Sequence, residues 1–215
     1  MTDFPAEYSA EERRWLLRLA HLSIRAAVTG RPLRTELGSR PESIQSAKQN
    51  TNQNTNQNII QASPHLRELR GAFTTLHANG ALRGCIGFVM AVEPLEQAIR
   101  ETAQAAALED PRFPPVTEAE LESLQLEISV LSPMFEIAPE DVVVGRHGLM
   151  VSYDGRRGLL LPQVPGEWGW DRETFLVQTC RKAGLPPDVL KKGAKLEAFT
   201  AEVFGEATPG ESMRD

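Results

Sequence analysis

The stretch Gly71-Ala72-Phe73-Thr74-Thr75-Leu76-His77-Ala78-Asn79-Gly80-Ala81-Leu82-Arg83-Gly84-Cys85-Ile86-Gly87 carries the strongest structural signal in this chain of 215 residues. An Asn-Gly dipeptide between two runs rich in apolar and β-branched residues is typical of a β-hairpin with a two-residue turn. The stretch therefore predicts two antiparallel strands that meet at Asn79 and Gly80.

The turn also predicts which residues lie opposite one another in the hairpin. The expected pairs are Ala78 with Ala81, Leu76 with Arg83, and Thr74 with Cys85. Directly paired residues share a face, so this register places Cys85 on the face opposite to that of His77. A Cys85–His77 dyad is disfavoured unless a bulge, which Gly84 could supply, shifts the register.

Cys85 stands in an unusual chemical setting for a strand residue. Arg83 precedes it, and Gly84 and Gly87 flank it. A nearby cation favours the reactive thiolate, and glycines allow a substrate to approach the backbone closely. A lone cysteine in a strand is otherwise more often a small buried apolar residue.

The segments on either side of the hairpin predict helices and further strands. Capping-box patterns at Ser9–Glu12 and Thr117–Glu120 begin helices, Pro94 begins another that runs to Leu108, and Asp171 caps a fourth. Strands are predicted at 126–130, 148–153, 158–161 and 195–204, with Arg156 and Arg157 absorbed into the turn after Asp154-Gly155. Hairpins with helices between them indicate an α+β fold with a largely antiparallel sheet and packed helices.

Composition excludes several classes of partner. The 23 Lys and Arg against 29 Asp and Glu give a net charge of −6, which provides no basic field for nucleic acid or anionic lipid. No leader-like or membrane-spanning run is present, so we expect a cytoplasmic protein with one domain over 1–215. Thr51-Asn52-Gln53-Asn54 is repeated directly, and we interpret the polar tract over 44–62 as a flexible insertion.

The sequence gives no support for a metal or a cofactor. Its two cysteines, Cys85 and Cys180, lie in unrelated contexts and are expected to stay reduced, and its four histidines lack zinc-site spacing. The Gly84-x-x-Gly87 spacing is too short for a dinucleotide fingerprint, and no G-x-S-x-G elbow occurs. We expect no cofactor and no metal.

Six motifs, in this order, resemble the motif set of the AMMECR-type domain family, and in particular its prokaryotic branch, protein A of the AmmeMemoRadiSam system. They are Gly71–His77, Leu82–Gly87, Asp110-Pro111-Arg112-Phe113, Leu126–Pro133, Gly145–Leu149 and Gly158–Val164. The resemblance covers about residues 9–205, which leaves 206–215 as a tail.

The resemblance implies a larger and a smaller lobe in one compact unit, with Leu82–Gly87 as the suspected active segment. It implies no settled activity. The system label implies a pathway shared with a radical S-adenosylmethionine enzyme and a MEMO-type protein.

Several other residues are candidates for the same site, each with a structural alternative. Glu127 lies at a polar position of an apolar strand and is either a general base or the ion-pair partner of Arg83 or Arg112. His147, flanked by glycines, is either an acid–base group or an ordinary turn residue. Gln163 either presents its amide to a ligand or braces a loop. Asp110 and Arg112 are explained by mutual pairing at a helix end.

Two hypotheses of function follow. In the first, Cys85 is a nucleophile in a cleft, Arg83 stabilises the thiolate or a substrate anion, His147 or Glu127 transfers protons, and Gly84, Gly87 and Gln163 contact the substrate. In the second, the protein is a non-catalytic ligand-binding or adaptor protein in which Arg83, Cys85 and Gly87 shape a pocket or docking surface. Nucleophilic catalysis requires the sulfur atom, whereas a docking surface tolerates Cys85→Ser.

Overall fold

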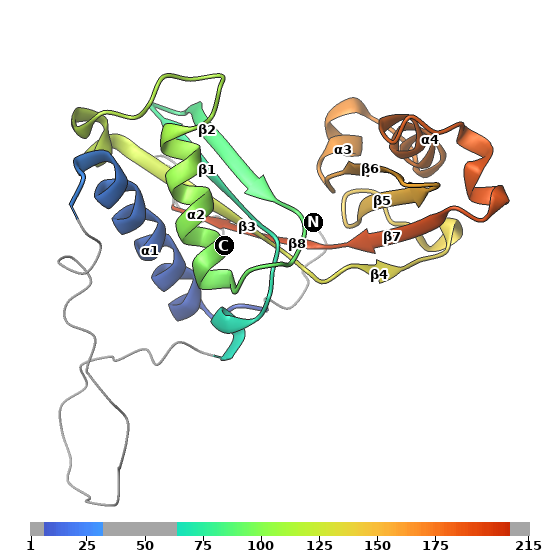
Figure 1. Cartoon of the computed structure of the whole chain (residues 1–215), viewed down its shortest axis with the longest axis horizontal. Coiled ribbons are helices and arrows are strands. Elements are labelled where there is room, and N and C mark those ends of the chain that lie inside the picture. The colour runs from blue at the N-terminus through green and yellow to red at the C-terminus, as the bar shows by residue number, and fades with distance from the viewer. Residues whose placement is uncertain (1–6, 32–63, 207–215) are drawn as a thin grey trace, which may run out of the picture.

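The computed structural model describes residues 7–31 and 64–206 and shows an α+β fold with two antiparallel four-stranded sheets, as the sequence predicts. The polar tract predicted over 44–62 and residues 207–215 of the predicted tail lie outside the described residues. Each sheet belongs to one lobe, and the lobes lie side by side along the long axis (Figure 1).

The larger lobe is built on the sheet with strand order β2-β1-β3-β8. Its elements are β1 (Ala72–Ala78), β2 (Ala81–Phe88), β3 (Leu124–Leu131), β8 (Ala201–Gly205), α1 (Ala10–Thr29), α2 (Leu95–Leu108) and the 3₁₀ helices η2 (Pro64–Arg67) and η3 (Glu118–Ser123). Asn79 and Gly80 both have positive φ angles, 53° and 78°, which confirms the predicted hairpin turn.

Local capping explains where the helices of this lobe begin. The Ser9 hydroxyl accepts the Glu12 N–H at 3.2 Å, and the Glu12 carboxylate accepts the Ser9 N–H at 2.9 Å. The same reciprocal arrangement links Thr117 and Glu120 at the start of η3. Both predicted capping boxes are therefore confirmed.

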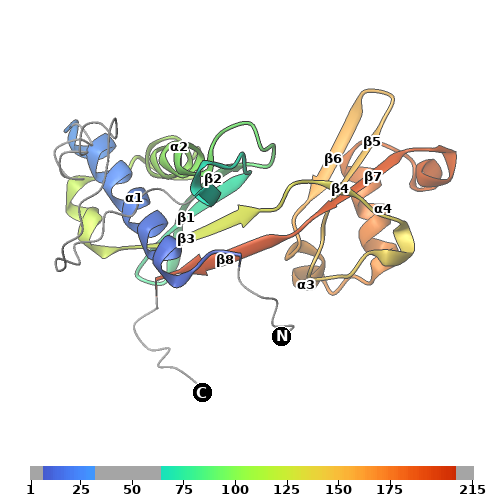
Figure 2. The same ribbon diagram turned by 90° about the horizontal axis from the view of Figure 1, so that it is seen from below.

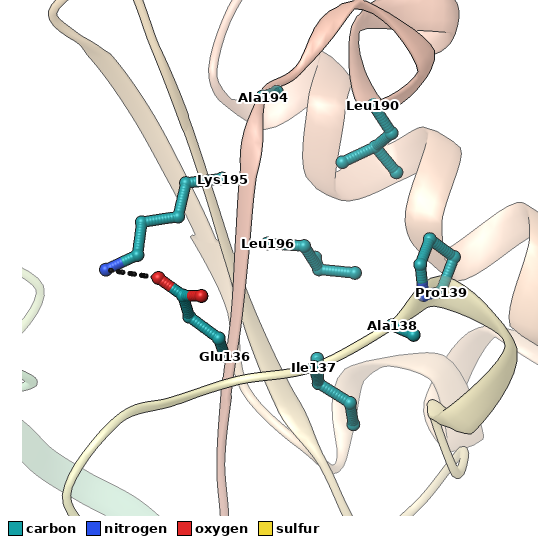
Figure 3. Close-up of a pocket in the computed structure, with 8 residues that line it drawn as sticks. All are labelled: Glu136, Ile137, Ala138, Pro139, Leu190, Ala194, Lys195 and Leu196. Carbon is teal, nitrogen blue, oxygen red and sulfur yellow. Dashed lines mark ion pairs between the residues drawn. The ribbon is translucent and has the colours of Figure 1, made fainter.

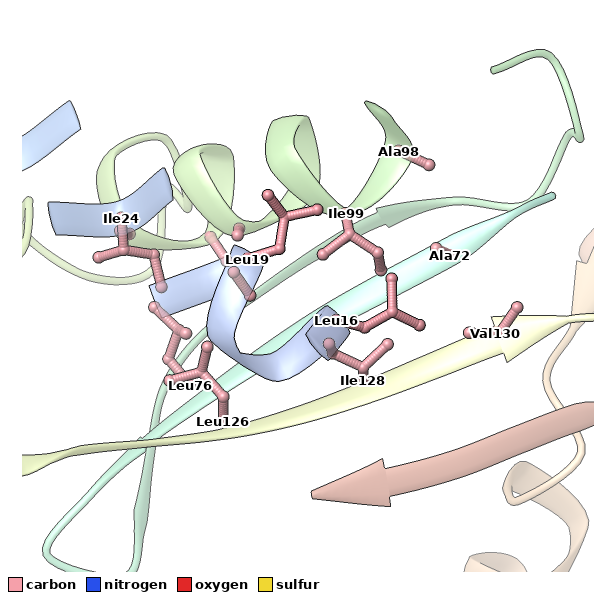
Figure 4. Packing of buried hydrophobic residues seen from close by; sticks show 14 of the residues in the cluster. Leu16, Leu19, Ile24, Ala72, Leu76, Ala98, Ile99, Leu126, Ile128 and Val130 are labelled. Atoms are coloured by element: carbon pink, nitrogen blue, oxygen red, sulfur yellow. The ribbon is translucent and has the colours of Figure 1, made fainter. Parts of the chain in front are cut away.

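Helices α1 and α2 cover only one face of this sheet (Figures 1 and 2). The larger hydrophobic core lies between these two helices and the sheet, and it includes Leu16, Ile99, Leu76 and Ile128 (Figure 4). On β1 and β3, buried residues alternate with half-buried ones, as expected when only one face meets the core. We call the opposite side the helix-free face; register places on it Phe73, Thr75, His77, Cys85, Glu127, Ser129, Val203 and Gly205.

The smaller lobe is built on the sheet with strand order β4-β7-β5-β6. Its elements are β4 (Phe135–Glu136), β5 (Gly148–Tyr153), β6 (Arg156–Leu160), β7 (Lys195–Phe199), α3 (Val164–Trp168), α4 (Arg172–Lys182), η4 (Pro139–Asp141) and η5 (Pro187–Lys192). Its own core includes Leu149, Phe175, Cys180 and Ala198.

The second hairpin corrects the predicted turn. Arg156 pairs with Tyr153 and Arg157 with Ser152, so both arginines belong to β6 and not to the turn. Asp154 and Gly155 complete the reversal alone because both adopt positive φ angles, 49° and 73°.

The lobes are joined by two chain segments that run next to each other. The Ser132 N–H donates to the Thr200 carbonyl oxygen, and the Thr200 N–H donates to the Ser132 hydroxyl, both at 2.9 Å. The strand predicted over 195–204 is therefore wrong as a single element, because β7 and β8 lie on either side of Thr200 and join different sheets. None of the helices within the described residues is long and apolar enough to cross a membrane.

Candidate functional site

A β-bulge at Arg83 decides where Cys85 lies. The strands pair His77 with Leu82 but Leu76 with Gly84, so Arg83 is an extra residue on β2. Cys85 consequently pairs with Thr75, and the predicted pairs Leu76 with Arg83 and Thr74 with Cys85 are wrong. One extra residue moves all the later side chains of a strand to the other face.

Close packing of β2 on α2 accounts for this bulge. Gly84 is buried, and a Cβ atom at this position would collide with the Ala106 carbonyl oxygen of α2. The bulge turns Gly84 toward the helix and Cys85 away from it. It also places Cys85 on the same face as His77, contrary to the predicted register, although no hydrogen bond joins these two side chains in the described structure.

Cys85 is half-buried on the helix-free face and has two polar neighbours. The Thr75 hydroxyl donates a hydrogen bond to Sγ over 3.3 Å. The second neighbour is Arg112, whose guanidinium donates to the Cys85 backbone carbonyl oxygen and to the Asp110 carboxylate.

Asp110 and Arg112 also close the outer edge of β2 at Cys85. The Cys85 N–H donates to Asp110 Oδ2 at 2.8 Å, and Arg112 donates to the Cys85 carbonyl oxygen at 3.3 Å. The predicted pairing between the two is confirmed, because Arg112 donates to Asp110 at 2.7 and 2.9 Å. This bond lowers the pKa of Asp110, which keeps the buried carboxylate ionised.

Arg83 pairs with Glu120 and not with the Cys85 thiol, which was the expected neighbour. Its Nε donates to Glu120 Oε1 at 2.8 Å, and the bond to Arg83 lowers the pKa of Glu120. Glu120 also closes the capping box of η3 with Thr117. Arg83 therefore pairs with a carboxylate, and the guanidinium that contacts Cys85, at its carbonyl oxygen, is that of Arg112.

Glu127 lies in the same row as Cys85. Thr75 pairs with Cys85 on one side and with Glu127 on the other, so the three residues occupy adjacent strands on one face. Arg83 and Arg112 are paired with Glu120 and Asp110, so the alternative in which Glu127 is the ion-pair partner of one of them does not hold in the structure. Within the described ranges, the Glu127 carboxylate has no hydrogen bond or ion pair.

His147 belongs to the smaller lobe. It is buried, its Nδ1 accepts the Val143 N–H at 3.1 Å, and its ring meets Phe135 edge to face. Burial lowers the pKa of His147, and the charge of Arg146 lowers it further. No described hydrogen bond joins His147 to Cys85, and the contacts described for His147 lie within the smaller lobe.

Two of the residues expected to contact a substrate, Gly84 and Gly87, lie in β2, and the third, Gln163, lies in the other lobe. Gly84 faces α2, and Gly87 lies beneath the Phe73 ring. Gln163 is exposed in the smaller lobe just before α3, where its backbone carbonyl oxygen accepts the Glu167 N–H at 3.1 Å.

The structure also contains a hollow of about 380 Å³ in the smaller lobe, away from these residues (Figure 3). The apolar side chains of Ile137, Leu190 and Leu196 line it, and the Lys195–Glu136 ion pair, at 3.4 Å, lies beside it. No cluster of three or more potential metal ligands occurs in the part of the chain that the structure describes.

Comparisons with known proteins agree on one relationship. The family model described as AMMECR1 matches residues 42–204. A protein of Thermococcus gammatolerans is 50% identical over 163 residues, covering 70% of this chain and 80% of the relative. Protein MJ0810 of Methanocaldococcus jannaschii is 46% identical over 162 residues, covering 70% of this chain and 81% of the relative.

A solved structure has the same fold. The crystal structure of the uncharacterized protein PH0010 from Pyrococcus horikoshii superposes with a TM-score of 0.69 and 39% identity. The match covers 95% of this chain and 96% of that one.

Proposed function

This chain belongs to the AMMECR1 family, and from that premise we propose that it is a thiol-dependent small-molecule or modification enzyme whose nucleophile is Cys85. The observation that carries the proposal is the position of the thiol. Cys85 is half-buried on a sheet face that no helix covers (Figure 2), the Thr75 hydroxyl donates to its Sγ at 3.3 Å, and the Arg112 guanidinium donates to its backbone carbonyl oxygen at 3.3 Å.

The neighbours of Cys85 support attack by a thiolate. In the proposed reaction the thiol first loses its proton to water, and the Thr75 hydroxyl donates a hydrogen bond to the sulfur that attacks. In the proposed step, a bond forms between Sγ and an electrophilic carbon of the substrate as the bond from that carbon to its leaving group breaks. The electron pair of the broken bond departs with the leaving group.

The rigidity of the segment supports the same proposal. Both polar atoms of the Cys85 backbone are held by Asp110 and Arg112, and the preceding bulge is held by the Arg83–Glu120 ion pair. A nucleophile fixed by its surroundings loses little conformational entropy when it meets a substrate.

A second candidate function is a non-catalytic ligand-binding or adaptor protein that docks a partner through the Arg83–Gly87 segment. Exposed apolar side chains on the helix-free face favour it: Leu82 is 41% exposed and Val203 is 53% exposed. Surface apolar groups of this kind suit a protein contact.

We further propose that the chain belongs to the branch of AmmeMemoRadiSam system protein A. On this proposal it is cytoplasmic and acts with a radical S-adenosylmethionine enzyme and a MEMO-type protein. The ordered motifs in the sequence support this placement.

The test is alkylation of the folded protein with iodoacetamide across a pH series, measured residue by residue by mass spectrometry. Cys180 is the internal control, because it is fully buried and burial raises the pKa of its thiol. Rapid labelling of Cys85 at neutral pH is the expected result. Labelling of Cys85 only when the protein unfolds would refute the nucleophile.

The Cys85→Ser variant separates the two candidate functions. Serine preserves the size of the side chain but lacks the nucleophilic sulfur, so an enzyme loses its turnover. A docking surface retains its partner with a modest loss of affinity.

A further inference from the structure

We propose that Glu127 binds a cationic nitrogen of the substrate, so that the molecule attacked by Cys85 is a small compound with an ammonium or guanidinium group. This inference rests on the proposed function, because it assigns the substrate of the same thiol. It replaces the role of general base that the sequence suggested for Glu127.

The first observation is that the Glu127 carboxylate is unpaired. The side chain is half-buried in β3, and within residues 7–31 and 64–206 it has no hydrogen bond or ion pair. The two arginines considered as partners of Glu127, Arg83 and Arg112, form ion pairs with other carboxylates. An ionised carboxylate with reduced access to water gains free energy from a cation that reaches it.

The second observation is that small residues flank Glu127 on the helix-free face. Its partner on β8 is Gly205, which has no side chain. Thr75, on the other side of Glu127, carries only a short side chain.

The third observation is the order of charged and polar groups across the sheet, from Cys85 through Thr75 to Glu127. The Arg112 cation donates to the Cys85 carbonyl oxygen at the β2 edge, the Thr75 hydroxyl follows on β1, and the Glu127 carboxylate follows on β3. The strands β2, β1 and β3 lie in this order in the sheet (Figure 1). Neighbouring strands are about 4.8 Å apart, so the Cys85 and Glu127 backbones are separated by about 10 Å. A compound with an electron-poor carbon at one end and a cationic nitrogen at the other matches this order of charges.

The test uses three methanethiosulfonate reagents that differ only in charge: aminoethyl, ethyl and sulfonatoethyl. In each reaction Cys85 Sγ attacks the sulfenyl sulfur, a disulfide forms and methanesulfinate leaves. Rates are measured at low ionic strength, where the Debye length is about 30 Å. In the parent protein we expect the aminoethyl reagent to react with Cys85 faster than the neutral ethyl reagent, because Glu127 attracts its ammonium group.

The decisive variant is Glu127→Gln, and the matched control is Glu140→Gln, which removes the same charge from an exposed position in the smaller lobe. We expect Glu127→Gln to lower the ratio of the cationic to the neutral rate about 3- to 5-fold, from the Coulomb energy of one charge at this range. The control should leave the ratio unchanged. Equal ratios in the parent and Glu127→Gln would overturn the assignment.

A second measurement decides the inference even when Cys85 is unreactive. The Cys85→Ser protein is titrated with n-butylammonium chloride while the backbone amide resonances of Thr75, Glu127 and Gly205 are followed by NMR. We expect saturable shifts at these positions that disappear in the Cys85→Ser, Glu127→Gln double variant. Shifts that are the same in both proteins refute the cation site, whereas failure of every thiol reagent refutes the nucleophile.

Discussion

The hydroxyl of Thr75 donates a hydrogen bond to Sγ of Cys85 across the hairpin, and this contact exists only because Arg83 is bulged out of the pairing between the two strands. A register without the bulge would point the thiol into the hydrophobic core. The outward position of Cys85 and the packing of the hairpin therefore have one structural cause.

We expect Thr75→Val to slow the alkylation of Cys85 by iodoacetamide about 2- to 10-fold at neutral pH. Valine keeps the shape of the side chain but removes the donor, and a hydrogen bond of this kind contributes about 0.5–1.5 kcal/mol. Ser129→Ala, which removes a hydroxyl from the same face, is the control. An unchanged rate in Thr75→Val would show that the hydroxyl does not stabilise the thiolate.

Arg112→Gln should slow labelling by the anion iodoacetate more than labelling by neutral iodoacetamide. The guanidinium attracts the anionic reagent by its charge, whereas the uncharged amide of glutamine does not. The control is Arg157→Gln, at an exposed position of β6. If both reagents slow equally, Arg112 acts on Cys85 through the geometry of the strand edge and not through its charge.

Gly84→Ala should destabilise the fold by about 1–3 kcal/mol, the usual cost of forcing an extra methyl group into a packed interior. The new methyl group would meet the Ala106 carbonyl oxygen, so β2 and α2 must separate. Gly166→Ala is the matched control, because no atom lies within 4 Å of its Cβ position. Urea unfolding measures both; equal stability of the two variants would contradict the close approach.

Protonation of His147 should destabilise the smaller lobe at acidic pH. Its pKa is lowered in the folded protein, chiefly by burial, so the unfolded chain binds the proton more readily. The contribution of neutral His147 to stability is complete above the unfolded value of about 6.5 and is lost as the pH falls toward the lower folded value.

The His147→Gln variant isolates this effect from the other histidines. Glutamine does not titrate, and its amide oxygen can accept the Val143 N–H in place of Nδ1. Urea unfolding at pH 8 and pH 5.5 should show a smaller loss of stability in the variant than in the parent. An identical loss in the two proteins would mean that His147 is not the group that titrates.

Local sequence patterns predicted the elements whose causes are local. The capping boxes at Ser9 and Thr117, the turn at Asn79-Gly80 and the alternation in β3 all depend on residues within a few positions of each other. The bulge at Arg83 was not predictable in this way, because it depends on the backbone of Ala106 in a helix that follows later in the chain.

In the candidate site, too, the residues with local signals were predictable, and the contacts made by distant segments were not. Cys85 and Glu127 were identifiable from their own strands, but Arg112 was not assigned to the thiol, because its contact with Cys85 arises from the packing of a later loop on the edge of β2. Arg83, adjacent in sequence to the candidate segment, was the more obvious choice and proved to be bound to Glu120. Residues 195–204 read as one continuous strand, although β7 and β8 separate at Thr200. No local sequence signal marks the point at which a strand passes from one sheet to another.

The order of strands has a consequence for synthesis on the ribosome. β8 completes the larger sheet beside β3, yet it emerges only after every element of the smaller lobe, from Phe135 to Phe199. Until then the nascent chain presents β3 as a bare edge from Glu127 to Leu131, a template for pairing with other chains. Emergence of β8 is thus the event that both covers this edge against other chains and sets Gly205 beside Glu127.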